Sequence, residues 1–165
     1  MKLLMLVCLS LVLCAQPYAS ERHASKIAPN GETTVSAAFG KTKLVAVFHT
    51  STVEISTDDK TPRFAQCTYS RVPCSLTGQI KIFVDGTDIL VPGAAYADLG
   101  DISTAEFSTK EGFFVLTITG GDASESYLAR LVFNKNRLLE RRLYSGEDPD
   151  HVLEVSHFYK TPALN

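Results

Sequence analysis

Hydrophobic and polar residues alternate along most of the chain after about residue 31, and this two-residue period predicts β-strands. The runs TTVSAAF (33–39) and KLVAVFHTSTVEIS (43–56) are rich in β-branched and aromatic residues, which strands favour. Apart from one helical turn expected at 94–99, no segment carries an apolar stripe at helical spacing. The pattern therefore predicts an all-β domain.

The segment 79–93, QIKIFVDGTDILVPG, predicts the clearest hairpin. Its centre is Asp85-Gly86, a dipeptide that two-residue type I′ turns prefer. A turn at this position places the large apolar side chains of both arms on one face, so the local turn signal and the hydrophobic pattern agree. The expected pairs are Val84–Thr87, Ile82–Ile89 and Ile80–Val91.

A second hairpin is expected around residues 134–136, and two loop lengths compete there. A two-residue loop places Arg130 opposite Arg141, and opposed like charges are unfavourable. A three-residue loop at 134–136 places Arg130 opposite Glu140, which contributes roughly 0.2–1 kcal/mol. We therefore predict the three-residue loop, which also pairs Leu131 with Leu139 and Val132 with Leu138.

The stretch GGDASES (120–126) gathers glycines, hydroxyls and carboxylates, as catalytic and phosphate-binding loops do. It lacks the Lys-Ser/Thr that opens the helix of a P-loop, and it lacks the Gly-x-Ser-x-Gly of a nucleophile elbow. Strands are expected on both sides of it. We interpret it as a hairpin loop, and a partner-binding loop is the alternative.

These signals predict one all-β domain over residues 32–165, preceded by a flexible arm at 20–31. About eight or nine mostly antiparallel strands are expected, closed as a small barrel or packed as a sandwich. The last three strands should form a meander.

The first residues indicate export. Lys2 supplies one positive charge, a mostly apolar run follows from Leu3 to Leu13, and small and polar residues come next. This is the layout of a secretory signal peptide over residues 1–19, with cleavage after Ala19 or, alternatively, after Ala15. The apolar run is shorter than the roughly 20 residues that cross a membrane. The protein is then periplasmic or secreted.

A lipoprotein is the second interpretation of the same residues. The sequence LVLC, which ends at Cys14, resembles the lipobox in which the cysteine is acylated. Leu13 stands where that motif has a small residue, so the sequence departs from it. Under this interpretation the protein contacts a membrane through a lipid on Cys14.

Cys67 and Cys74 are the two cysteines that remain after the signal peptide. Because exported proteins meet an oxidising compartment, we predict a disulfide between them. A zinc site would need further ligands at metal spacing nearby, and a redox pair favours the closer Cys-x-x-Cys spacing.

The formal net charge of the chain is −2 at pH 7, which argues against a nucleic-acid partner because such a partner calls for a basic face. No Asn-x-Ser/Thr site follows the signal peptide, and this favours a bacterial envelope protein. No glycine-rich nucleotide motif is present, and no cofactor is expected.

Two clusters near the C-terminus could suggest a metal. The residues of His151-x-x-Glu154-x-x-His157 point to opposite sides of a strand, which argues against a shared metal. Glu147, Asp148 and Asp150 lack the remaining ligands of a calcium loop, and Pro149 indicates a turn. We predict no metal site.

Arg141 and His157 are the candidate ligand-binding residues. Arg141 falls on an apolar strand face, where an arginine is costly unless it is paired. Three arrangements would satisfy its guanidinium group: contact with water at the edge of the barrel or sandwich, a pair with a buried carboxylate, or an anionic ligand in a cavity. The first two arrangements are the more common.

The leading functional hypothesis is an exported, non-catalytic bacterial envelope protein that binds a protein or a small ligand, as an inhibitor or accessory factor does. It depends on the export signal, the disulfide, the β scaffold and the lack of a catalytic motif. The alternative is a small hydrolase that acts on envelope polymers through scattered Asp, Glu and His residues.

Overall fold

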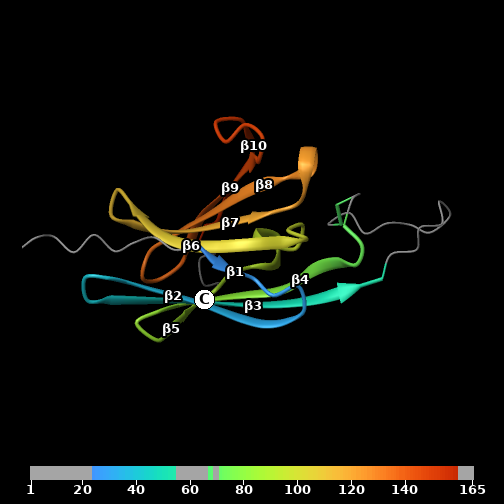
Figure 1. The fold of residues 1–165 in the computed structure, drawn as a ribbon. Helices are drawn as coiled ribbons and strands as arrows, with labels where there is room; N and C mark the ends of the chain where they lie inside the picture. Colours follow the sequence, from blue (N-terminus) through green and yellow to red (C-terminus); the bar gives the residue numbers. More distant parts are fainter. Residues whose placement is uncertain (1–23, 55–66, 69–70, 160–165) are drawn as a thin grey trace, which may run out of the picture.

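Two antiparallel sheets lie face to face in the computed structural model, which describes residues 24–54, 67–68 and 71–159 (Figure 1). This confirms the prediction of an all-β antiparallel domain, and the architecture is a sandwich rather than a closed barrel. The predicted signal peptide, with Cys14, lies outside the described residues.

The smaller sheet has four strands in the order β2-β3-β4-β5. The hairpin at Asp85-Gly86 is confirmed, because Val84 pairs with Thr87 and Ile82 with Ile89. Both turn residues have positive φ, 51° and 84°, as a type I′ turn requires. The ladder does not extend to Val91, since β5 ends at Ile89. The strands are β2 (Gly31–Phe39), β3 (Thr42–Val53), β4 (Cys74–Val84) and β5 (Thr87–Ile89).

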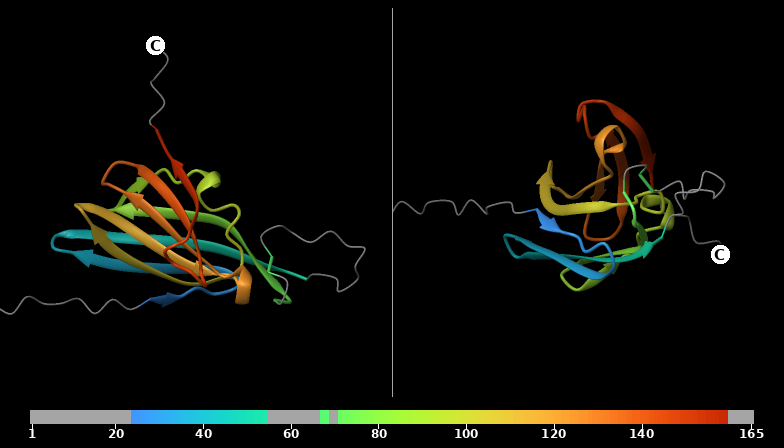
Figure 2. Two further views of the ribbon diagram at one scale, coloured as in Figure 1. Left: turned by 90° about the horizontal axis from the view of Figure 1, so that it is seen from above. Right: turned by 45° about the vertical axis from the view of Figure 1, so that its right-hand side comes forward.

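The larger sheet has six strands in the order β1-β6-β7-β8-β9-β10, so its last five strands follow one another as a meander. This confirms the C-terminal meander expected from the sequence. Figure 2 shows that the strands from β6 to β10 follow a curved surface. The strands are β1 (Ser25–Lys26), β6 (Ile102–Lys110), β7 (Phe113–Gly120), β8 (Tyr127–Phe133), β9 (Leu138–Ser145) and β10 (Val152–His157).

Part of the segment expected as an arm belongs to the larger sheet. Ser25 pairs with Ala105 of β6, and Ile27 is buried in the core. No signal in the sequence indicates this pairing, because a strand of only two residues shows no alternation of apolar and polar positions.

Two short 3-10 helices occur in the connections. The first, η1 (Gly93–Ala95), lies where the sequence predicts a helical turn, and a further turn brings the Leu99 N–H to the Tyr96 carbonyl. The second, η2 (Ala123–Glu125), lies within GGDASES. That stretch connects the antiparallel strands β7 and β8, so it is a hairpin loop as interpreted.

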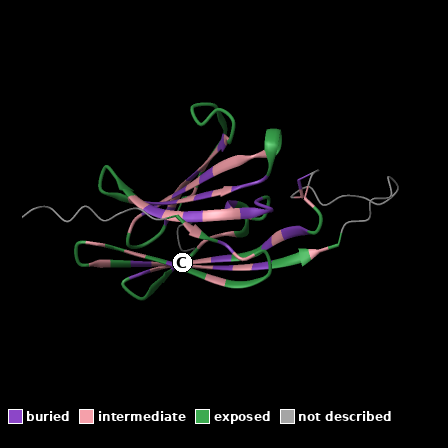
Figure 3. Ribbon diagram, viewed as in Figure 1, coloured by how far each residue is buried: buried purple, intermediate pink, exposed green. Residues whose placement is uncertain are grey.

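The core lies between the two sheets, and strand alternation decides which side chains enter it (Figure 3). On β3 every second residue from Leu44 to Thr50 is buried, and β7 and β8 supply the facing apolar layer. The largest buried apolar side chains are Phe48, Phe133, Leu44, Ile80, Ile82, Ile89, Leu99, Leu116, Ile118 and Leu131. Each contributes about 1.5–3 kcal/mol by leaving water.

The register predicted for β8 and β9 is wrong. Four residues, 134–137, connect these strands, and the Asn134 side chain accepts N–H groups from Asn136 and Arg137. A register shift follows between Val132 and Phe133. As a result Arg130 stands opposite Arg142 rather than Glu140. Leu131 pairs with Arg141 rather than with Leu139, and Val132 pairs with Glu140 rather than with Leu138.

Candidate functional site

The solvent-facing side of the six-stranded sheet is hollowed into a groove of about 630 Å³, within the range of roughly 300–1,000 Å³ usual for small-molecule sites. Side chains from all five strands from β6 to β10 line it. We call this hollow the outer groove, because it lies on the face of the sheet that points away from the core.

The floor of the outer groove carries apolar side chains on both sides of a polar row formed by Thr117, Arg130 and Arg142. Val115 of β7 lies opposite Val132 of β8, and Leu128 of β8 lies opposite Tyr144 of β9. Val115 and Tyr144 are only 5% and 7% exposed, although both point away from the core. The sheet thus carries apolar side chains on both faces in its middle strands, whereas a solvated face normally alternates with polar residues.

Glu140 forms a polar cluster with Arg142 and His157 at the side of the groove. The Arg142 guanidinium donates hydrogen bonds to both carboxylate oxygens, with Nη2 3.2 Å from Oε2. His157 Nδ1 lies 3.5 Å from the same Oε2. The hydrogen bond from Arg142 is the main reason that the pKa of Glu140 is lowered, and the same bond raises the pKa of Arg142.

Arg130 lies in the groove without a carboxylate of its own. Its guanidinium carbon is 4.7 Å from the centre of the Tyr144 ring, an arrangement that favours the cation. Thr117 stands opposite it on β7, and Arg142 stands opposite it on β9. Among the described residues of the chain, no carboxylate is within ion-pair distance of Arg130.

Arg141, the first candidate from the sequence, lies on the core face of β9 and is 1% exposed. Its Nη1 donates to Glu154 Oε1 at 2.7 Å, and its Nη2 donates to Asp98. Both carboxylates are about half exposed, so the buried guanidinium is paired with carboxylates that themselves contact solvent. Its Nε has no hydrogen-bond partner within the part of the chain that the structure describes.

His157, the second candidate, lines the outer groove from β10. It also borders a second hollow of about 660 Å³, whose other walls include Leu90, Phe158 and Tyr159. The structure therefore separates the two candidates, because Arg141 lies on the core face and His157 on the groove face. Glu154, between His151 and His157 in the sequence, turns to Arg141 instead of to a histidine.

The acidic stretch before β10 forms a turn. The His151 N–H donates to the Asp148 carbonyl at 2.9 Å, and the Asp150 N–H lies 3.3 Å from the Asp148 carboxylate. Across residues 24–54, 67–68 and 71–159, no three His, Cys, Asp or Glu side chains are grouped so that they could hold a metal ion.

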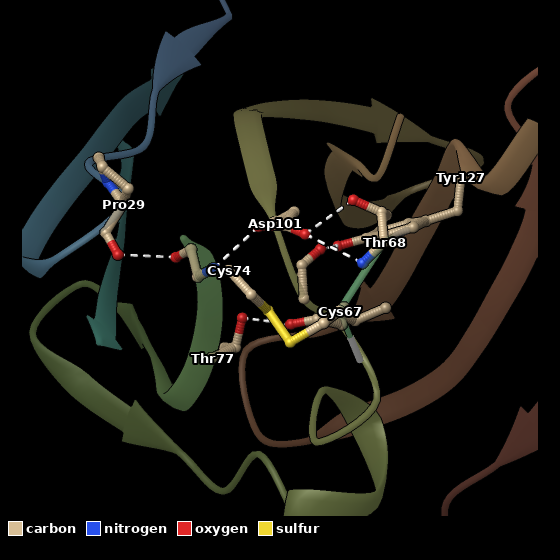
Figure 4. Close-up of a disulfide and its surroundings, with 10 residues drawn as sticks. Pro29, Cys67, Thr68, Cys74, Thr77, Asp101 and Tyr127 are labelled. Carbon is tan, nitrogen blue, oxygen red and sulfur yellow. Dashed lines mark hydrogen bonds between the residues drawn. A yellow bond between two sulfur atoms is a disulfide. The ribbon is translucent and has the colours of Figure 1, made fainter. Parts of the chain in front are cut away.

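The predicted disulfide between Cys67 and Cys74 is present, with Cα atoms 5.5 Å apart (Figure 4). Beside it, Asp101 receives hydrogen bonds from the residue that follows each cysteine. Its Oδ2 accepts the N–H and hydroxyl of Thr68 at 3.2 and 2.9 Å, and its Oδ1 accepts the Ser75 N–H at 2.8 Å. Asp101 is 2% exposed, so one buried carboxylate secures both sides of the disulfide.

Tyr127 closes the other side of this network. Its hydroxyl donates to the Gly100 carbonyl at 2.8 Å. Burial raises the pKa of Tyr127, and the nearby negative charges of Asp98 and Asp101 raise it further. The phenol therefore stays protonated and serves as a hydrogen-bond donor at any physiological pH.

Sequence reasoning missed Arg130, Tyr144 and Asp101. For Arg130, a signal exists in its own run YLARLVF and in the neighbouring run FFVLTIT, where apolar residues occupy both strand faces. Tyr144 lies outside both runs, and its contact with Arg130 crosses from one strand to the next. For Asp101 the partners are distant in sequence, and no local pattern indicates them.

Comparison with protein-family models, with curated proteins and with solved structures gives no match for this chain. In the described ranges, no helix has the length and apolar character needed to cross a membrane.

Proposed function

We propose that this chain is an exported, non-catalytic binding protein of the bacterial envelope and that the outer groove is its binding surface. The observation that carries the proposal is a groove that faces solvent and has apolar side chains in its floor beside charged groups. Val115 and Tyr144 are covered almost as completely as core residues, yet they lie on the outer side of the sheet. The exposed Phe113 and the partly exposed Val132 add apolar surface to the same groove, and a concave site that combines apolar side chains with a few charged groups is typical of ligand binding.

Export is supported by two independent features. The disulfide between Cys67 and Cys74 fits an oxidising compartment, such as the periplasm or the medium. The charged and apolar pattern of residues 1–19 is typical of a signal peptide. Anchoring through a lipid on Cys14 is the alternative form of export and leaves the binding surface unchanged.

A binding role also fits the state of the ionisable groups in the groove. A hydrolase that cleaves with a pair of carboxyl groups needs a general acid whose pKa is raised towards neutrality, whereas the pKa of Glu140 is lowered by its hydrogen bond from Arg142. His157 faces the same carboxylate. These contacts hold the polar groups of the groove in place, as a recognition surface requires.

Filling the groove tests the proposal. Thr117→Trp adds a large side chain within the groove, and Thr34→Trp adds the same side chain to an exposed position of β2 on the other sheet. The wild-type chain and both variants, each shown to be folded by circular dichroism, are immobilised and exposed to envelope extract and to its small-molecule fraction.

The proposal expects a bound species that the wild type and Thr34→Trp retain and that Thr117→Trp loses. Its binding should also raise the melting temperature of the first two proteins alone. Equal capture by all three proteins, or no capture by any of them, contradicts the assignment of the groove as the binding surface.

A further inference from the structure

We propose that the outer groove binds an amphipathic organic anion, whose charged head contacts Arg130 and whose aliphatic tail covers the apolar floor. This inference rests on the proposed binding function and specifies the chemistry of the ligand. It commits to a single occupant, a chain of aliphatic carbons that ends in a carboxylate or a similar anionic group.

The head position follows from the charges around Arg130. Arg142 already shares its charge with Glu140, whereas Arg130 has the face of the Tyr144 ring and no carboxylate among the described residues. Because Arg130 and Arg142 stand directly opposite each other, their repulsion is relieved only in part by Glu140. An anion beside Arg130 completes the neutralisation.

Arg130 is also prepared for an anion by its surroundings. The Tyr144 ring restricts the guanidinium, so less rotamer freedom is lost when an anion binds. The Thr117 hydroxyl, directly opposite Arg130 on the same face, offers a second donor. Glu106 stands on the far side of Thr117, two strands from Arg130, and so confines an anionic head to the Arg130 side.

The tail position follows from the register of β7 and β8. Two residues along from the Thr117–Arg130 pair, on the same face, Val115 lies opposite Val132. Phe113 lies two residues further on and lines the same groove. Phe113 is 39% exposed and Val132 is partly exposed, so these two side chains offer apolar surface beside the nearly buried Val115. At about 3.3 Å per residue, this apolar track extends roughly 13 Å from Thr117, which suits an aliphatic chain.

A series of headgroups on one tail tests the inference. Laurate, dodecyl maltoside and dodecyltrimethylammonium present an anionic, a neutral and a cationic head on saturated aliphatic chains of about the same length. Their affinities for the full chain without its signal peptide are measured by calorimetry below the micelle-forming concentrations. Shifts of the Val115 and Val132 amide resonances identify the groove as the binding site.

Two variants locate the anionic head. Arg130→Gln removes the charge and keeps a polar side chain of similar length. Arg137→Gln makes the same change in the β8–β9 loop, outside the outer groove, and serves as the matched control. Folding of both variants is checked by their melting curves, and the headgroup series on the wild type needs no variant at all.

We expect laurate to bind the wild type at least about tenfold more tightly than the other two compounds, as a charge-assisted hydrogen bond allows. Arg130→Gln should lose this preference, and Arg137→Gln should keep it. Equal affinity for the three heads, or a laurate preference that survives Arg130→Gln, overturns the inference and leaves groove binding intact. If none of the three compounds binds, the inference is overturned as well. The proposed function is tested separately, by the capture experiment with Thr117→Trp.

Discussion

The Asp101 carboxylate accepts the Ser75 N–H at 2.8 Å and so joins the start of β6 to the start of β4. The Asp101 N–H in turn donates to the Ser75 carbonyl at 2.7 Å, so the two residues exchange hydrogen bonds. The same carboxylate holds Thr68, which follows Cys67. A single buried side chain therefore connects the two sheets and the disulfide segment.

Asp101→Asn should destabilise the protein by about 1–3 kcal/mol, because the amide nitrogen turns a donor towards groups that are themselves donors. Asparagine tolerates the positive φ of 50° at this position, so the substitution leaves the backbone unstrained. Urea unfolding measures the effect. Asp88→Asn, at an exposed position of β5, is the control and should change stability by less than about 0.5 kcal/mol. A similar small change for Asp101→Asn would show that the carboxylate is not needed.

Replacing Cys67 and Cys74 together by serine should cost about 2.5 kcal/mol, the chain-entropy value for a closed loop of this length. The comparison is urea unfolding of the oxidised wild type and of the double variant. Mass spectrometry of the purified mature wild type should detect no free thiol. Recovery of two free thiols from a protein exported to an oxidising compartment would contradict the compartment argument.

Local signals decided which parts of the fold could be predicted. The Asp85-Gly86 turn carries its own conformational preference, so the pairing of Ile82 with Ile89 follows from residues close in sequence. The β8–β9 register failed because Asn134 caps a longer loop and a bulge follows it. The geometry of that loop outweighed the small stabilisation expected from pairing Arg130 with Glu140.

The candidate site was less predictable than the fold. The disulfide was predicted from the spacing of two cysteines and from an expected export signal, and both are local features of the sequence. The groove depends on the curvature of a sheet and on the pairing of Arg130 with Tyr144 across strands, and neither is local. The failed register even hid the opposition of Arg130 and Arg142, on which the ligand inference depends.

Gly121→Ala should be strongly destabilising if GGDASES is a tightly packed hairpin loop. A Cβ at Gly121 would lie 2.2 Å from the Glu125 carbonyl oxygen, and φ there is 72°. Gly112→Ala, in the β6–β7 turn, meets the same positive φ with open space around it. We expect about 1 kcal/mol for Gly112→Ala from backbone strain alone, and at least about 2 kcal/mol for Gly121→Ala. Equal decreases of the melting temperature for Gly121→Ala and Gly112→Ala would show that the loop shifts to accommodate the added Cβ.

Arg141→Met and Arg141→Ala separate the packing of this buried side chain from its charge. Methionine fills a similar volume, and Asp98 and Glu154 are exposed enough to be solvated by water once the cation is gone. We therefore expect Arg141→Met to lie within about 1 kcal/mol of the wild type in urea unfolding. Arg141→Ala leaves a cavity and should cost about 2–5 kcal/mol. Equal costs for the two variants would show that the ion pairs, rather than the volume, stabilise this part of β9.

The dependence of stability on pH provides a further check on Arg141. The pKa of Glu154 is lowered by hydrogen bonds from Ser156 and from Arg141, so its contribution is present above the ordinary value of 4.5 and is lost as the pH falls through the folded value. Unfolding free energies measured from pH 6 to pH 3 should decline less steeply for Arg141→Met than for the wild type. The difference should be small, because the carboxylate is 46% exposed. Arg137→Gln should follow the wild-type curve, and an Arg141→Met curve parallel to both would mean that the Ser156 hydroxyl alone lowers this pKa.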